Sequence, residues 1–231
     1  MKTMRIISLT VCLILIAFSL SGKTKKIKEV RETGSFTAIN GSSGVDIYFT
    51  QDKIQKVEVE AEKSILEKVI VKVEKDVLLI ERKDKNNPAH HNESNHVRVY
   101  ITAPTITVLN LKEGADFESK SLNCNGDFSI GLLSGGGIEI NNLTISGNIV
   151  ITAERGADCT INKLKCNNCE ITASGGADIE IEMESSGNLN LIASGSSDVE
   201  LKGVTKKASI TKGAGVDIDI ASLKYEDIEW K

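Results

Sequence analysis

Aspartates recur at one place in a repeated phrase, and a row of carboxylates is the first candidate for chemistry in this chain. The phrase is Gly-Ala-Asp in its full form, as in Gly114-Ala115-Asp116, and it returns with small changes every 19 to 21 residues. Gly137 stands where a further aspartate is due. Carboxylate oxygens suit Ca²⁺, so such a row could hold calcium. Aspartate also accepts backbone N–H groups in turns, and we favour this structural role because Gly137 interrupts the row. The candidate binding residues are Asp46, Asp116, Asp158, Asp178, Asp198 and Asp217.

Four cysteines follow residue 22, but they do not form an evident disulfide framework. Cys159 and Cys169 replace Ile, Phe or Leu at inward positions, so we interpret them as small buried side chains. Cys124 and Cys166 share a column two repeats apart, too far for a bridge. Cys166 and Cys169 have CxxC spacing without the strand–helix context of a redox domain, so a local bridge there stays an open alternative. A lone CxxC lacks the further ligands that zinc needs.

The remaining polar groups do not favour catalysis. All three histidines lie in one polar segment, and with Glu93 they offer at most a weak transition-metal site, which we interpret as linker: His90, His91 and His96. Glycosidases need two carboxylates at a set separation, and several glutamates alternate with apolar residues: Glu139, Glu180, Glu182, Glu184 and Glu200. Outward residues of any soluble strand look the same, and the turns here are short. We therefore predict no catalytic residue, no metal and no cofactor.

The elements that carry these residues form a repeat. Three positions after the first residue of each phrase comes an apolar column: Phe117, Ile138, Cys159, Ile179, Val199 and Ile218. Five positions before it comes another: Leu109, Ile130, Ile151, Ile171, Leu191 and Ile210. A third column, eight positions after it, holds Leu122, Leu143, Leu164, Val204 and Leu223, with Glu184 breaking it. Polar residues alternate with the apolar ones, as in strands with one buried face.

Columns that recur at a fixed period of about 20 residues predict an all-β fold, a parallel β-solenoid whose coils stack on one another. An antiparallel sandwich is the structural alternative, but it does not require the columns to recur. We expect a linker over 23–32 and a single domain over 33–231. Within it, irregular strands over 33–103 act as a cap, regular coils fill 104–221, and 222–231 form a C-terminal cap.

A second kind of evidence comes from Phe36-Thr37-Ala38-Ile39-Asn40-Gly41, which leads into Gly44-Val45-Asp46-Ile47-Tyr48-Phe49-Thr50-Gln51. Together with the later Gly-Ala-Asp phrases, it resembles the putative auto-transporter adhesin "head GIN domain" family of exported bacterial proteins, over roughly residues 33–221. The resemblance implies a β-solenoid at the cell envelope and an adhesive role. It brings no catalytic residue with it.

The first 22 residues have the order basic, apolar, small that is typical of an export signal. Lys23 stands where the lipidated cysteine of a lipoprotein would be, so we expect export to the periplasm, the outer envelope or the medium without a lipid anchor. No later segment is apolar enough to span a membrane. The net charge of −4 becomes two units more negative without Lys2 and Arg5, which argues against nucleic acid as a partner.

These observations predict a non-enzymatic envelope module, an adhesin or surface-interaction protein that presents its solenoid faces to a protein or glycan. Association through the solenoid ends would give an oligomer. The alternatives are a periplasmic protein that binds a lipid or small ligand and, less favoured, a carbohydrate-active enzyme. A polar concavity on the surface would distinguish these alternatives from a featureless prism.

Overall fold

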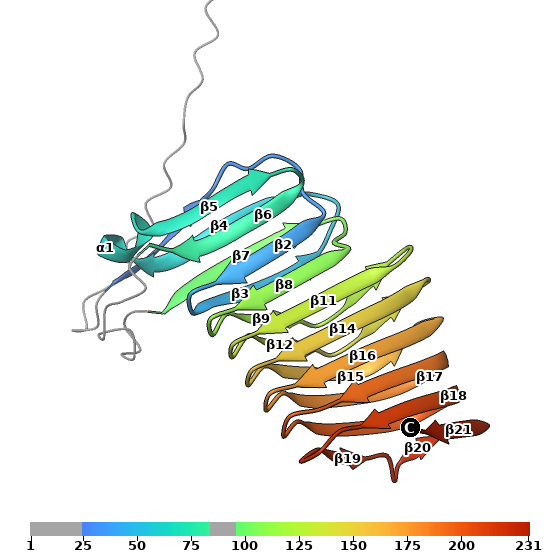
Figure 1. Ribbon diagram of the computed structural model, residues 1–231. Helices are drawn as coiled ribbons and strands as arrows, with labels where there is room; N and C mark the ends of the chain where they lie inside the picture. The colour runs from blue at the N-terminus through green and yellow to red at the C-terminus, as the bar shows by residue number, and fades with distance from the viewer. Residues whose placement is uncertain (1–24, 84–95) are drawn as a thin grey trace, which may run out of the picture.

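Successive coils of the chain lie on top of one another in register, as the recurring columns predicted. The computed structural model describes residues 25–83 and 96–231 and is a parallel β-solenoid of about six turns (Figure 1). Ile130, for example, pairs with Leu109 on one side and with Ile151 on the other. The parallel solenoid is thus confirmed over the antiparallel sandwich.

Each coil contributes to three faces. Face 1 holds β6 (Val77–Arg82), β2 (Ala38–Ser42), β8 (Val108–Lys112), β11 (Phe128–Leu133), β14 (Asn148–Glu154), β16 (Asn168–Ser174) and, at the end, β21 (Asp227–Trp230). Face 2 holds β7 (Val97–Ala103), β3 (Val45–Gln51), β9 (Asp116–Ser119), β12 (Gly137–Ile140), β15 (Asp158–Lys165) and β19 (Asp217–Asp219). Face 3 holds β10 (Leu122–Cys124), β13 (Leu143–Ile145) and β20 (Leu223–Lys224). The long strands β17 (Asp178–Ala193) and β18 (Asp198–Lys212) run through all three faces.

The N-terminal end differs because its strands are antiparallel. β4 (Lys56–Glu62) pairs with β7, β5 (Val69–Glu74) pairs with β6, and α1 (Lys63–Leu66) connects β4 to β5. β1 (Lys26–Val30) pairs with β4, so the linker predicted over 23–32 is wrong at this point. The sequence does not indicate this strand, because it carries the charged residues Lys26, Lys28 and Glu29. Charged side chains are common on edge strands, where they discourage pairing with a further strand. β2 and β3, also from this region, join the regular ladder in register.

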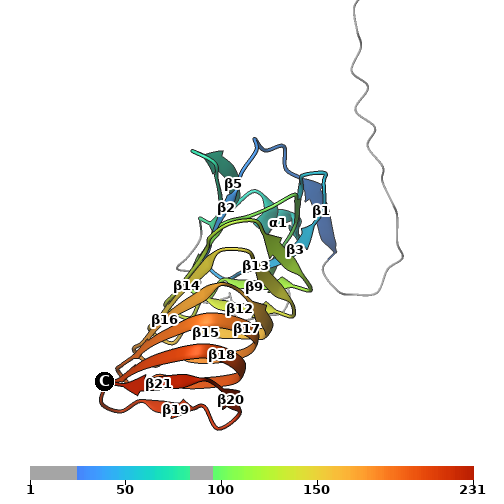
Figure 2. The same cartoon turned by 90° about the vertical axis from the view of Figure 1, so that its right-hand side faces the viewer.

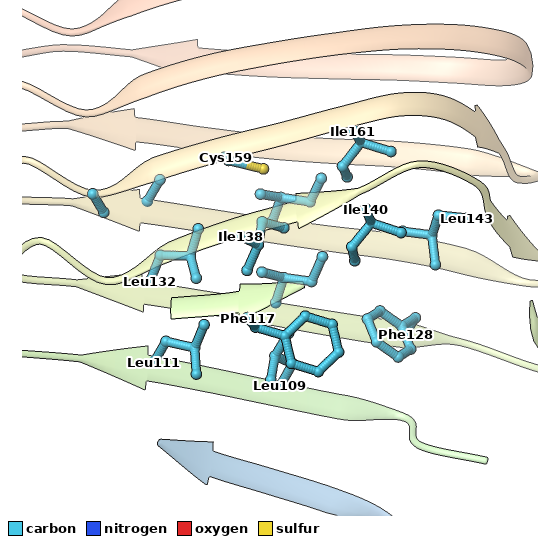
Figure 3. Close-up of a cluster of buried hydrophobic side chains, with 14 of the residues drawn as sticks. Leu109, Leu111, Phe117, Phe128, Leu132, Ile138, Ile140, Leu143, Cys159 and Ile161 are labelled. Carbon is cyan, nitrogen blue, oxygen red and sulfur yellow. The ribbon is translucent and has the colours of Figure 1, made fainter. Parts of the chain in front are cut away.

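The core is a column of stacked apolar side chains between the faces. Figure 3 shows Leu109, Phe117, Phe128, Ile138 and Ile161 pointing inward from successive coils. Each of these side chains is at most 5% exposed. Burial of each large apolar side chain stabilises the fold by about 1.5–3 kcal/mol. A coil buries its inward residues only against its neighbouring coils.

The third apolar column departs from its prediction in two coils. A register shift in β17 places Met183 opposite Leu164, so Met183 is fully buried and Glu184 is exposed. In the next coil Gly203 lies opposite both Met183 and Leu223, and Val204 is 46% exposed. The assignment of Val204 to the core is therefore wrong. A bulge that adds one residue to a strand moves every following side chain to the other face.

No element among the described residues covers the last described coil. Residues 222–231, which the sequence analysis assigns to a cap, include β20 and β21 of the ladder. Trp230 lies in register with the buried Ile210 but is 51% exposed, because no strand among the described residues covers it (Figure 1).

Candidate functional site

The six predicted aspartates lie in one row on face 2, beside the corner that leads into it from face 1. Asp46 pairs in register with Asp116, and from Asp158 the row continues through Asp178, Asp198 and Asp217. Gly137 lies between Asp116 and Asp158, as the phrase alignment indicated. The structure thus brings together all six residues that the sequence singled out.

The corner before this row is shaped by backbone conformation rather than by the carboxylates. Glu113 and Gly114 are consecutive residues with φ of 55° and 70°, and the equivalent pairs in most other coils also have positive φ. Glycine adopts this left-handed region without strain, which explains why it recurs at this place. Within residues 25–83 and 96–231, none of the six aspartates of the row accepts a hydrogen bond from a backbone N–H group. The turn hydrogen bonds expected of them are therefore not formed there.

Asp116 has the most perturbed environment in the row. Partial burial first, and then the charges of Asp46 and Asp158, raise the pKa of Asp116 to about 6. Its carboxylate occupies the space above Gly137, where a Cβ atom would lie 2.7 Å from Oδ1. Burial and the charges of Asp198 and Asp158 also raise the pKa of Asp178. Like charges at the spacing of neighbouring strands disfavour ionisation, so the row has a strongly negative potential.

The contacts of the row do not by themselves form a metal centre. His96 Nδ1 lies 3.3 Å from Oδ2 of Asp46 at the N-terminal end of the row, and both groups are partly exposed. In the part of the chain that the structure describes, no three His, Cys, Asp or Glu side chains are grouped as a metal ion requires. The other proposed ligands of the histidine segment, His90, His91 and Glu93, lie outside the described residues.

The four described cysteines are free thiols, and all are buried. Burial raises the pKa of Cys159 to about 12, as expected for a thiol with only apolar neighbours. Cys166 and Cys169 are hydrogen-bonded to each other across one corner. That bond, and a second one with Ser186, lower the pKa of Cys166, while the Cys166 contact and burial raise that of Cys169. The structure brings the CxxC pair together as free thiols, and a bridge between them stays an open alternative.

Sequence reasoning missed a hollow on the outside of face 1. It has a volume of about 480 Å³ and extends from β5 and β6 across β2, β8 and β11 to β14. Figure 2 shows β5 at the N-terminal end of the stack, and β6 lies between β5 and β2. The floor of the hollow is one row of side chains in register across five strands: Leu79, Asn40, Asn110, Gly131 and Thr152.

The floor carries no charge, whereas its rim carries four charged residues: Lys72, Glu81, Lys112 and Glu154. The amide groups of the floor are held in place by packing and hydrogen bonding. Asn110 Nδ2 donates to Oδ1 of Asn40 at 3.0 Å, and Asn110 Oδ1 occupies the space that a Cβ atom of Gly131 would need, 2.6 Å away. Face 1 therefore presents a fixed, uncharged surface with both hydrogen-bonding and apolar groups.

A second hollow, of about 660 Å³, lies on face 2 next to the N-terminal half of the aspartate row. Tyr48, Glu118 and Glu139 line it, and these three residues lie side by side on β3, β9 and β12. The hollow on face 1 thus has an uncharged floor, whereas two carboxylates line the hollow on face 2. No helix in the described ranges is long and apolar enough to cross a membrane.

The fold and these surfaces define a repeat protein of the parallel β-solenoid class with open faces. The chain belongs to the family described as "Putative auto-transporter adhesin, head GIN domain", which matches residues 35–231. No protein with a curated description matches the chain.

Solved structures share the fold. A putative adhesin from Bacteroides fragilis is similar with a TM-score of 0.68 and 17% identity, covering 90% of this chain and 97% of that one. A structure titled putative lipid binding protein, from Parabacteroides distasonis, has a TM-score of 0.49 and 12% identity, covering 90% and 94% of the two chains. A putative adhesin from Parabacteroides merdae has a TM-score of 0.49 and 13% identity, covering 91% and 97%. At 17% identity, the likeness to the Bacteroides fragilis structure shows the fold alone.

Proposed function

We propose that the protein is a non-enzymatic recognition module of the cell envelope, exported by the signal over residues 1–22, and that the hollow of face 1 binds a protein or glycan partner. The observation that carries the proposal is the uncharged floor from Leu79 to Thr152. Charged residues make up 26% of the chain, so an uncharged row across five strands marks a surface suited to contact rather than to solvation.

The chemistry of the hollow supports recognition rather than catalysis. Its two carboxylates, Glu81 and Glu154, lie on strands β6 and β14, separated by β2, β8 and β11. Four strand spacings of about 4.8 Å place them roughly 19 Å apart, far beyond the separation that a pair of glycosidase carboxylates uses. The amide and hydroxyl groups of Asn40, Asn110 and Thr152 can instead hydrogen-bond to peptide groups or sugar hydroxyls.

A small ligand is the second candidate, and the size of the hollow favours it. A volume of about 480 Å³ lies in the usual range of roughly 300–1,000 Å³ for small-molecule sites. Leu79 and Leu133 offer apolar contacts within it. A bound lipid or metabolite would co-purify with the protein and be seen by native mass spectrometry, whereas a macromolecular partner would not be retained in this way.

The test is a binding screen of the purified protein against glycan and matrix-protein arrays, with calcium and with EDTA. Thr152→Glu places a charge on the floor of the hollow and is expected to abolish binding to every ligand that uses it. Thr172→Glu is the matched control, because Thr172 pairs with Thr152 on the next strand and does not line the hollow. Ligands that Thr152→Glu leaves bound, or no reproducible ligand on any array, would contradict the proposal.

A further inference from the structure

Two tyrosines on face 2 form a stack that already holds a cation at one end. The ring centroids of Tyr48 and Tyr100 are 5.3 Å apart with an interplanar angle of 22°. Lys28 Nζ lies 3.8 Å from the centroid of the Tyr100 ring. A cation in this position is attracted by the negative potential over the ring. Tyr48 is the opposite end of the stack, and its next neighbour along the face is Glu118 on β9.

The hollow beside Tyr48 contains two carboxylates that have no polar partner among the described residues. Glu118 and Glu139 are neighbours in register on β9 and β12. Within the described ranges, neither forms a hydrogen bond or an ion pair, unlike Glu180 and Glu200, which both contact Lys202 on the same face. The wall of the hollow is fixed, because Gln51 bonds to the backbone of Asn123 through both ends of its amide at 2.8 Å.

The charges around Tyr48 make this hollow strongly negative. The hydroxyl of Tyr48 has a raised pKa because of burial and then because of Glu118 and Asp46. Burial first, and then neighbouring carboxylates that include Glu118, also raise the pKa of Asp116 in the same strand. Lys120 is the one basic residue among those that line the hollow, and it lies at the end of β9. An aromatic ring beside unpaired carboxylates is the arrangement that stabilises an ammonium or guanidinium group.

We propose that the hollow at Tyr48 binds a lysine or arginine side chain from an extended basic segment of a partner protein. The bound cation would contact the Tyr48 ring as Lys28 contacts Tyr100, and its N–H groups would donate to Glu118 and Glu139. The aspartate row continues away from this point along face 2, so further basic residues of the same segment find a carboxylate of the row in every coil from Asp158 to Asp217. Anionic glycans and lipid headgroups are repelled by this surface. The site is separate from the hollow of face 1 and does not depend on it.

The test measures binding of fluorescently labelled octa-arginine and octa-lysine peptides to the purified protein by anisotropy, with octa-glutamate and a neutral Gly-Ser peptide as negative probes. Tyr48→Ala is expected to weaken binding of the basic peptides about five- to tenfold, and Tyr48→Phe to change it less than about twofold, because the ring supplies the attraction. Glu118→Gln with Glu139→Gln weakens binding further, and Lys120→Ala strengthens it. Thr152→Glu on face 1 leaves it unchanged.

Matched controls separate a local site from diffuse charge attraction. Tyr225→Ala removes an exposed tyrosine elsewhere, and Glu226→Gln with Glu229→Gln removes the same number of charges from the last coil. Circular dichroism identifies any variant that fails to fold. If Tyr48→Ala does not fold, Tyr48→Phe and the glutamine variants test the proposal. The proposal is overturned if neither basic peptide binds, if the Glu226/Glu229 pair weakens binding as much as the Glu118/Glu139 pair, or if a neutral oligosaccharide displaces the peptides.

Discussion

Replacing Asp116 by asparagine should stabilise the protein at neutral pH, although it removes a charged surface residue. The folded-state pKa of Asp116, about 6, lies above the unfolded value near 3.8. A carboxyl group of this kind adds stability only below its unfolded pKa, and this stability is lost as the pH rises through 6. Above pH 6 the ionised group is therefore a cost that the neutral amide of Asp116→Asn does not have.

The expected gain follows from the size of the shift. About two pKa units correspond to roughly 3 kcal/mol for a group shielded from solvent. Asp116 is only partly buried and one side of it faces water, so screening reduces the expected gain to about 1 kcal/mol. Urea unfolding followed by circular dichroism at pH 7.5 and pH 3.5 measures it, and the gain should appear only at the higher pH.

The control is Asp227→Asn, an exposed aspartate on β21 outside the row. It should change the free energy of unfolding by less than about 0.5 kcal/mol at both pH values. High salt should shrink the gain from Asp116→Asn, because added ions screen the contribution of its neighbours. Destabilisation by Asp116→Asn at pH 7.5, or an equal effect at both pH values, would refute the electrostatic account of the row.

Three further predictions concern the core, the corners and the thiols. Ile151→Ala, at a fully buried position with a coil on either side, should cost about 2–5 kcal/mol in urea unfolding, and a cost below 1 kcal/mol would contradict the stacked core. In the same assay, Gly203→Ala should lower the free energy of unfolding more than Gly114→Ala. Both glycines have positive φ, but an added Cβ atom meets the Met183 carbonyl oxygen at Gly203 and nothing within 4 Å at Gly114. Equal losses for the two variants would show that backbone strain alone decides. With oxidised glutathione, the first disulfide should link Cys166 and Cys169, as peptide mapping by mass spectrometry would show, and a bridge that involves Cys124 first would contradict the observed pairing of thiols.

The stack of coils was predictable because its cause is local and repeated. Each coil carries the same alternation of apolar and polar residues, so one register, such as Ile130 opposite Leu109, extends to all coils. The position of the aspartate row follows from the same register. Met183 continues the alternation of Ile179 and Ile181, whereas the repeat period alone aligns Glu184 with Leu164. The register shift between Ile161 and Leu164 was not predictable from the repeat, because it depends on packing between the coils.

The two hollows could not be predicted for a different reason. Their floors consist of outward residues, and side chains such as Asn40, Gly131 and Thr152 resemble those of any solvated strand. The shape of the hollow on face 1 depends on β5 and β6, which pair antiparallel at the N-terminal end, and that of the hollow on face 2 depends on the contact of Gln51 with Asn123. Contacts of this kind join residues far apart in the sequence, and no column of the repeat contains them. The polar concavity expected to distinguish the functional alternatives is therefore visible only in the folded chain.

The most direct test of the central claim is the ratio of two dissociation constants for the strongest array ligand, measured with Thr152→Glu and with its neighbour Thr172→Glu. Recognition through the hollow of face 1 predicts that Thr152→Glu weakens binding at least about tenfold while Thr172→Glu stays close to the unmodified protein, a difference of about 1.4 kcal/mol or more. Equal dissociation constants for the two variants, both folded, would contradict it and would place the binding surface elsewhere on the solenoid.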